Sequence, residues 1–328
     1  MFFIEIELCA KLSPGKLNIW QEFLKKASLE ADMGVEKIAL VWDDEELIAT
    51  GSREGNILKC IAVDENHRGE DLTATVLSEL QKDAFSLGYS HLFLYTKPEN
   101  NAMFSSLFFC EVARTDKVLL MENRQGGVKN FVAGLPKGDT TGTIGSIVMN
   151  ANPFTLGHRF LVEKAAEKCD HVYVFVLSED KSEFSFADRI RLVEEGTKDI
   201  VSVTVLPTGP YLISSATFPT YFLKERDKAS EIQCMLDIEV FANYYAPAFN
   251  ITKRFVGTEP ISPMTNMYNE ALLKSLPQKG IEVVEIPRTE KENSPISASR
   301  VRALMKEGKW DEIKLLVPEA TFNHLKSM

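Results

Sequence analysis

Two short motifs in the second half of the chain carry residues that could hold phosphate. In the first, Thr155, Gly157 and His158 follow the apolar run 144–149 and the step Asn152-Pro153, which ends that run because proline lacks a backbone donor. Apolar positions after His158 recur at helical spacing, so the turn opens a helix. A helix start presents unpaired N–H groups and a positive dipole end, and an imidazole there can donate to a phosphate oxygen in a transition state. A histidine at this position can equally be a helix cap or a surface residue.

The second motif spans residues 296–302 and offers two hydroxyls and a guanidinium. The apolar spacing that follows predicts a helix from about residue 298, with Ser297 and Ser299 in its first turn and Arg302 one turn along. N–H groups, hydroxyls and a fork-shaped cation together can bind phosphate. The alternative is a serine cap followed by solvated arginines. Two such motifs in one chain favour a shared phosphate site over coincidence.

Further candidates follow other predicted strands. Lys181 could reach a triphosphate, or it could belong to a charged surface loop, and Arg189 could brace the site. Gly257 ends a predicted strand and suits close approach of adenine or ribose, because it has no side chain. Thr258 and Glu259 add hydrogen-bonding groups, although Glu259 can also be a helix-start acid.

These motifs fall in a region where predicted strands and helices alternate. Such alternation indicates a Rossmann-like, doubly wound parallel sheet, which binds ligands at the carboxyl ends of its strands. The motif turns all fall on that edge. The predicted strands are 143–149, 171–177, 201–206, 253–256 and 281–286, and the predicted helices are 158–168, 187–197, 238–246, 264–275 and a last one after residue 297.

The first part of the chain is predicted to form a separate α+β domain. A stretch rich in Gly, Lys, Asn and Thr follows it, as expected for a connection. We therefore expect this domain over residues 1–130, a linker over 131–142 and a catalytic domain over 143–328. The predicted strands of the first domain are 3–8, 37–42, 47–52, 57–63 and 91–95, and its predicted helices are 17–27 and 72–87.

Composition restricts the partners. The 328 residues are 45% hydrophobic and 26% charged, as in ordinary globular proteins, and the net charge is −10. We exclude nucleic acid as a partner, because the chain lacks the basic field that such binding needs. No apolar run approaches the roughly 20 residues of a membrane span, and no basic leader precedes the first apolar residues, so we expect no membrane association and a cytoplasmic location. The five cysteines have no C-x-x-C spacing, and we expect no metal held by the protein alone.

The two phosphate motifs resemble the signatures of the nucleotidylyltransferase superfamily. Residues 155–158 (TLGH) resemble its (H/T)-x-G-H element, and residues 296–302 (ISASRVR) resemble its I-S-S-T-x-x-R element. The first domain resembles a GCN5-type N-acetyltransferase (GNAT), whose coenzyme A turn would be residues 68–73. Asp71 stands where that family has glycine, and a carboxylate facing a diphosphate costs on the order of several kcal/mol. This GNAT-like domain is therefore expected to act as a scaffold or to receive a pantetheine-like thiol arm.

Over its whole length the chain resembles the citrate lyase ligase family, through these motifs and through residues 209–219 (GPYLISSATFP) and 256–260 (VGTEP). The resemblance implies a ligase that acetylates the thiol of the phosphoribosyl-dephospho-coenzyme A group on the acyl carrier subunit of citrate lyase. Acetate and ATP would form acetyl adenylate and diphosphate, and AMP would leave when the thiol takes the acetyl group. Mg²⁺ would accompany the nucleotide. Residues 209–219 are the candidate wall that meets the acyl group or the thiol arm.

The implied mechanism divides the candidates into two sets. Thr155 and His158 would hold α-phosphate oxygens, Arg302 would hold the leaving diphosphate, and acetate needs no general base because it is ionised at pH 7. Two alternatives stay open: an adenylyltransferase that acts on phosphopantetheine or nicotinamide mononucleotide, and a non-enzymatic protein that binds a carrier or senses acyl-CoA. The catalytic candidates are Thr155, His158 and Arg302, and the nucleotide-binding candidates are Asn152, Gly157, Lys181, Arg189, Gly257, Thr258, Glu259, Ser297 and Ser299.

Overall fold

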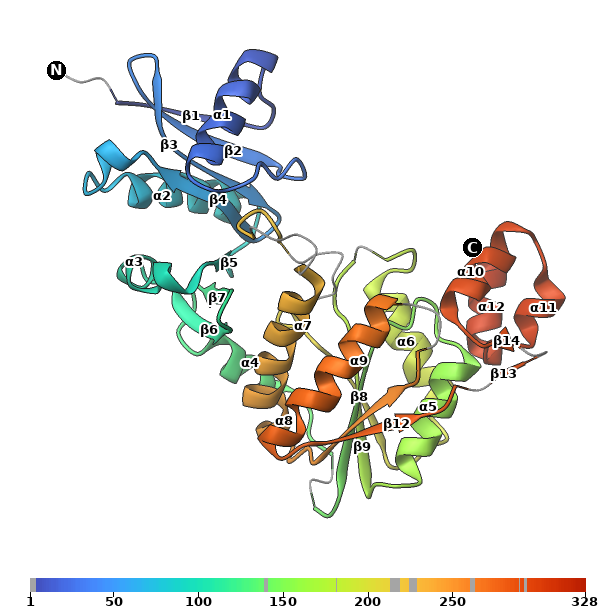
Figure 1. The fold of residues 1–328 in the computed structure, drawn as a ribbon. Helices are drawn as coiled ribbons and strands as arrows, with labels where there is room; N and C mark the ends of the chain where they lie inside the picture. The colour runs from blue at the N-terminus through green and yellow to red at the C-terminus, as the bar shows by residue number, and fades with distance from the viewer. Residues whose placement is uncertain are drawn as a thin grey trace. The chain divides into compact units, whose positions relative to one another are not determined.

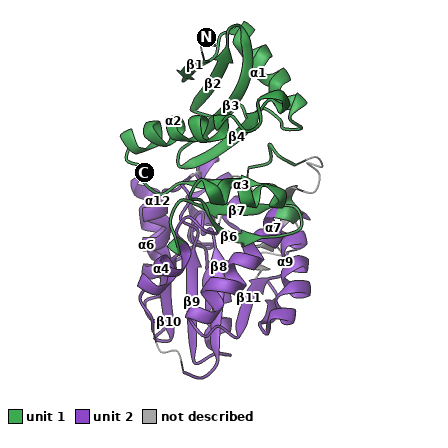
Figure 2. Cartoon of the chain, turned by 90° about the vertical axis from the view of Figure 1, so that its left-hand side faces the viewer, with its two compact units in different colours: residues 1–127, 219–232 green, residues 128–218, 233–328 purple. Residues whose placement is uncertain are grey.

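The structure is a computed structural model that describes residues 4–138, 141–180, 182–212, 219–223, 229–259, 263–288, 290–291 and 294–328. The chain divides into two compact units (Figure 2). Unit 1 comprises Met1–Gly127 and Pro219–Ile232, and unit 2 comprises Val128–Phe218 and Gln233–Met328. The domain ranges expected from the sequence stay a prediction. The structure shows in addition that unit 1 includes a segment from the second half of the chain, Pro219–Ile232.

Unit 1 is an α+β fold around a seven-stranded sheet with the strand order β1-β2-β3-β4-β5-β7-β6 (Figure 1). Strands β4 and β5 are parallel and pair at Ile57 with Phe93 and at Leu58 with Leu94. Beyond these pairs, the described residues of β4 and β5 form no further sheet pairs with each other. The elements are β1 (Ile4–Cys9), α1 (Pro14–Lys26), β2 (Lys37–Asp43), β3 (Glu46–Glu54), β4 (Ile57–Val63), α2 (Leu72–Ser86), β5 (Phe93–Thr96), α3 (Asn101–Ser106), β6 (Cys110–Arg114) and β7 (Leu119–Glu122).

Unit 2 contains a five-stranded parallel sheet with the strand order β10-β9-β8-β11-β12, which confirms the predicted doubly wound fold. After this sheet, three short helices pack around residues such as Val301 and Leu316, in a cluster that also includes Phe184 from the loop after β9. The elements are α4 (Gly127–Gly134), β8 (Ile144–Met149), α5 (Leu156–Ala166), β9 (His171–Val176), α6 (Phe186–Thr197), β10 (Val203–Pro207), α7 (Ala229–Val240), a π-helical turn (Phe241–Tyr245), α8 (Ala246–Ala248), β11 (Lys253–Gly257), α9 (Pro263–Ser275), β12 (Glu282–Ile286), β13 (Glu290–Lys291), β14 (Ser294–Pro295), α10 (Ala298–Lys306), α11 (Trp310–Lys314) and α12 (Glu319–Ser327).

The order of the strands reverses between β8 and β11. The chain first builds outward from β8 to β9 and β10, and then returns to the other side of β8 to form β11 and β12. In the described residues, β8 and β11 pair only in their amino-terminal halves, at Gly145 with Lys253 and at Ser146 with Arg254. Open α/β sheets bind ligands at such a reversal, outside the carboxyl ends of the strands. The turns after β8 and β11 therefore flank the expected binding position.

Two predicted elements differ from those in the structure. The helix expected at 238–246 is preceded by α7, which begins at Ala229, because apolar residues already recur every four positions in that stretch. The first residues of the expected linker belong to α4, which buries Val128 and Val132 and therefore folds as a helix despite its glycines. Among the described helices, none is both long and apolar enough to cross a membrane.

Candidate active site

The turn after β8 locks His158 in one tautomer. Thr155 is the N-cap of α5, and its hydroxyl accepts a hydrogen bond from the backbone N–H of His158 at 3.3 Å. In return, the backbone N–H of Thr155 donates to His158 Nδ1 at 3.0 Å, which completes a capping box. Because Nδ1 accepts, the neutral ring carries its proton on Nε2. Thr155 is fully buried and positions His158, and its predicted contact with an α-phosphate oxygen stays a prediction.

The imidazole of His158 is neutral at physiological pH. The ring is half-buried and stacks on Phe154, with centroids 5.8 Å apart and planes 14° from parallel. Burial, followed by the positive charge of Arg288, lowers the pKa of His158 from its ordinary value of 6.5 to about 4. No hydrogen bond within the described part of the chain involves Nε2. The ring therefore offers an uncharged N–H donor at a helix start.

The two phosphate motifs meet in the structure. A Cβ added to Gly157 would lie 2.9 Å from the backbone oxygen of Ile296, so only glycine allows this approach. The next residue, Ser297, caps α10 by accepting a hydrogen bond from the backbone N–H of Arg300 at 3.2 Å. Its hydroxyl lies 3.3 Å from that of Ser299. The starts of α5 and α10 are therefore neighbours, although they are about 140 positions apart in sequence.

Arg302 also joins the two motifs. Its Nη1 donates to the backbone oxygen of Asn152, and its Nε lies 3.5 Å from Glu183 Oε2. The side-chain oxygen of Asn152 accepts from the backbone N–H of Phe184 at 3.2 Å, so this amide holds the loop after β9. These contacts involve Nη1 and Nε, so other N–H groups of the guanidinium remain available to a ligand. Lys181, in the same loop, lies outside the described residues.

Arg189 donates to oxygens of the loops that follow β8 and β9. The side chain is fully buried, and its Nε donates to the backbone oxygen of Phe184 at 3.1 Å. Its Nη1 donates to the backbone and side-chain oxygens of Asn150 and to the backbone oxygen of Leu177, and its Nη2 donates to that of Glu179. Both loops at the ends of β8 and β9 are thus tied to one guanidinium. These contacts fit the predicted bracing role of Arg189, and its predicted part in nucleotide binding stays a prediction.

The turn after β11 contacts an arginine that the sequence reasoning missed, Arg288, which itself follows β12. Thr258 accepts from Arg288 Nε through its backbone oxygen at 2.7 Å and from the Arg288 backbone N–H through its hydroxyl at 3.2 Å. Glu259 forms an ion pair with the same guanidinium. Gly257 has open space where a Cβ would stand, since no atom lies within 4 Å of that position. The only signal for Arg288 in the sequence is its place directly after a strand that ends at the binding edge.

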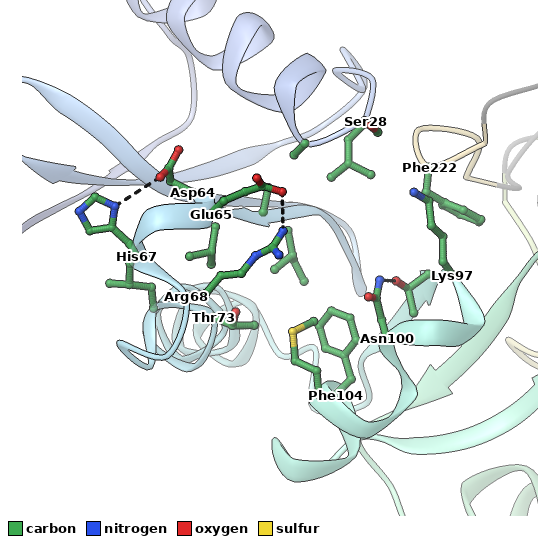
Figure 3. A pocket seen from close by; sticks show the side chains of 18 of the residues that line it. Ser28, Asp64, Glu65, His67, Arg68, Thr73, Lys97, Asn100, Phe104 and Phe222 are labelled. Carbon is green, nitrogen blue, oxygen red and sulfur yellow. Dashed lines mark hydrogen bonds and ion pairs between the residues drawn. The ribbon is translucent and has the colours of Figure 1, made fainter.

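Unit 1 contains a pocket of about 880 Å³ at the carboxyl ends of β4 and β5 (Figure 3). Figure 3 shows Glu65 and Arg68 from the loop after β4 on one side, and Lys97, directly after β5, and Phe104 of α3 on the other. Arg68 donates to Glu65 at 3.0 Å. Asp71 lines the pocket at the start of α2, in a left-handed conformation with φ of 55° and without a side-chain cap. Residues of the turn 68–73 therefore border the cavity, and the predicted role of this turn towards coenzyme A stays a prediction.

Comparison with known proteins gives one family match and close relatives. The family model described as the citrate lyase ligase C-terminal domain matches residues 144–325. The [citrate [pro-3S]-lyase] ligase of Klebsiella pneumoniae is 44% identical over 312 residues, which are 93% of this chain and 91% of that protein. The protein of the same name from Escherichia coli K12 is 41% identical over 94% of this chain and 89% of its own length. The crystal structure of Escherichia coli ElaA is similar to 37% of this chain and all of its own chain at 16% identity, with a TM-score of 0.33, which is too low to support an argument.

Proposed function

The chain belongs to the citrate lyase ligase family and is thus an enzyme of the ligase class, and we propose that it uses ATP to acetylate the prosthetic-group thiol of the citrate lyase acyl carrier subunit in the cytoplasm. The contact between Gly157 and Ile296 carries this proposal. It brings two helix starts together, and each presents N–H groups and a positive dipole end suited to phosphate. A triphosphate can therefore span both.

In the first step, an oxygen of acetate attacks the α-phosphorus of ATP. The new bond joins this oxygen to phosphorus, the bond from phosphorus to the β-phosphate oxygen breaks, and diphosphate leaves. His158 Nε2–H donates to an α-phosphate oxygen, while Ser297, Ser299 and Arg302 hold the leaving diphosphate. The nucleophile is already ionised, so catalysis rests on positioning and charge stabilisation.

Mg²⁺ would travel with the nucleotide. In the part of the chain that the structure describes, there is no group of three or more His, Cys, Asp or Glu side chains that could hold a metal ion. Phosphate oxygens and water, which are the usual ligands of Mg²⁺ on nucleotides, would provide most of its coordination. The hydroxyls of Ser297 and Ser299, 3.3 Å apart at the helix start, are oxygen donors of the kind this ion accepts.

In the second step, the carrier thiol attacks the carbonyl carbon of acetyl adenylate. The sulfur–carbon bond forms, the bond from that carbon to the phosphate oxygen breaks, AMP leaves and the thiol proton is released. The prosthetic group is phosphoribosyl-dephospho-coenzyme A, whose pantetheine part is long and bears amides. We assign the pocket of unit 1 to this arm, because about 880 Å³ accommodates such a chain and apolar Phe104 and Leu94 form part of its wall.

The test is acetate-dependent exchange of labelled pyrophosphate into ATP, followed by AMP release in the presence of the deacetylated carrier. His158→Ala should reduce the exchange rate by roughly 10²–10⁴-fold, since it removes one donor from the developing charge. A dinucleotide product would point to an adenylyltransferase, and absence of both reactions would leave only the binding role. Near-normal exchange by His158→Ala would remove this residue from the mechanism.

A further inference from the structure

The protein cation assigned so far to the proposed reaction centre, Arg302, lies on one flank of β8 only. The reaction brings the carboxylate of acetate to a negatively charged α-phosphate, and like charges at contact distance repel. His158 is neutral, and Arg189 is fully buried and spends its donors on backbone and amide oxygens. Arg302 is tied to the residues that follow β8 and β9. On the other flank of β8, towards β11, lies Arg288, whose positive charge lowers the pKa of His158.

The contacts of Arg288 aim it across the end of the sheet. The residue follows β12, the edge strand, but its Nε donates to the backbone oxygen of Thr258 and its Nη2 contacts Glu259, and both of these residues follow β11. The side chain therefore runs from the edge strand back towards β8, and its charge acts on His158. Its Nη1 has no hydrogen-bond partner among the described residues, and the side chain is 27% exposed.

Glu259 fixes this position. Its side chain is only 5% exposed, and a carboxylate with so little contact with water needs a partner cation. The ion pair and the hydrogen bond from Nε to the backbone oxygen of Thr258 hold one side of the guanidinium, which leaves the Nη1 side for a ligand. This is the arrangement of a cation held in place before its substrate arrives.

We propose that Arg288 is a further catalytic residue, whose Nη1 donates to an anionic oxygen at the reacting centre, on the attacking carboxylate or on the α-phosphate. The inference rests on the proposed function. Arg302 contacts residues that follow β8 and β9, whereas Arg288 contacts residues that follow β11, so the two cations lie on opposite flanks of the end of β8. An in-line displacement has its entering and leaving oxygens on opposite sides of phosphorus. One cation then serves each side.

The experiment compares Arg288→Met and Arg288→Lys in the pyrophosphate exchange assay. Arg288→Met should lower kcat/KM by roughly 10²-fold, and Arg288→Lys should recover part of the loss because it keeps the charge without the fork. A higher KM for acetate with unchanged KM for ATP assigns Nη1 to the carboxylate. A higher KM for ATP, or a lower kcat alone, assigns it to the α-phosphate. Exchange by Arg288→Met within threefold of the unmodified protein overturns the proposal.

The double variant Arg288→Met/Glu259→Gln separates catalysis from neutralisation of a buried carboxylate. If Arg288 served only Glu259, removing both charges would restore exchange, and that result also overturns the proposal. We expect the double variant to stay as slow as Arg288→Met, with its Tm recovered. Arg114→Met is the matched control, because Arg114 is paired with Glu111 in unit 1. Exchange by the unmodified protein and by this control tests the adenylation step of the proposed function, independently of the role of Arg288. Its absence in both would overturn that function and the inference together.

Discussion

Gly157→Ala tests directly whether the two helix starts must touch. The added Cβ would lie 2.9 Å from the backbone oxygen of Ile296, whereas ordinary contacts begin at 3.4 Å, so the two segments must separate by about 0.5 Å. The obstructing atom belongs to the backbone and cannot swing aside as a side chain would. Overpacking of this kind costs about 1–3 kcal/mol of unfolding free energy. Since 1 Å of misplacement at a reacting centre costs roughly 10²-fold in rate, half of that predicts a loss of roughly tenfold.

The rate is measured as acetate-dependent pyrophosphate exchange, and stability as the thermal midpoint. Gly15→Ala is the matched control, because its Cβ would meet no atom within 4 Å near the start of α1. This control should exchange at the unmodified rate and gain up to about 1 kcal/mol of stability. If Gly157→Ala matches the unmodified protein in both rate and midpoint, the contact at Ile296 has no part in assembling the site.

Three further predictions concern protonation, bracing and nucleotide contact. Because the pKa of His158 is about 4, the ring should stay neutral and kcat for exchange flat between pH 6 and 8; an inflection near 6.5 that disappears in His158→Gln would contradict this. The folded state also binds fewer protons than the unfolded chain between pH 6.5 and 4, so its unfolding free energy should fall as pH falls through that window. Arg189→Leu leaves buried carbonyl oxygens without donors and should lower Tm by roughly 10 °C, or about 3–4 kcal/mol, in a thermal melt; an unchanged Tm would rule out bracing. Gly257→Ala fills open space and should leave Tm unchanged while raising KM for ATP by roughly tenfold; an unchanged KM would remove adenine and ribose from this position.

Local patterns account for the part of the fold that could be predicted. Strand β8 is a short, mostly apolar segment, and α5 repeats its apolar positions at helical spacing, so both are visible in the sequence. The membership of Pro219–Ile232 in unit 1 leaves no such trace. It depends on contacts such as that of Tyr221, whose hydroxyl donates to the backbone oxygen of Tyr95 at 2.7 Å across 126 positions. Long-range packing of this kind has no period to detect.

The candidate site divides in the same way. His158 and Ser297 could be found because each belongs to a motif with a fixed order of residue types. Arg288 belongs to no such motif, and its place depends on Thr258 and Glu259, which precede it by about 30 positions. For Arg189 the sequence predicts both bracing and nucleotide binding, because spacing does not show whether a guanidinium meets a ligand or backbone oxygens. The role of each arginine depends on its hydrogen-bond partners, which lie in segments that follow other strands.

Because unit 1 is made from two stretches, the chain crosses from one unit to the other three times, after Gly127, Phe218 and Ile232. A fragment that begins at residue 128 would carry Tyr221 and Phe222 away from the cavity they help to line, and a fragment that ends at 127 would lack both rings. Neither fragment therefore contains the whole of unit 1. Chimaeras between relatives should exchange the whole chain or replace both stretches at once, since a simple end-to-end graft would divide unit 1.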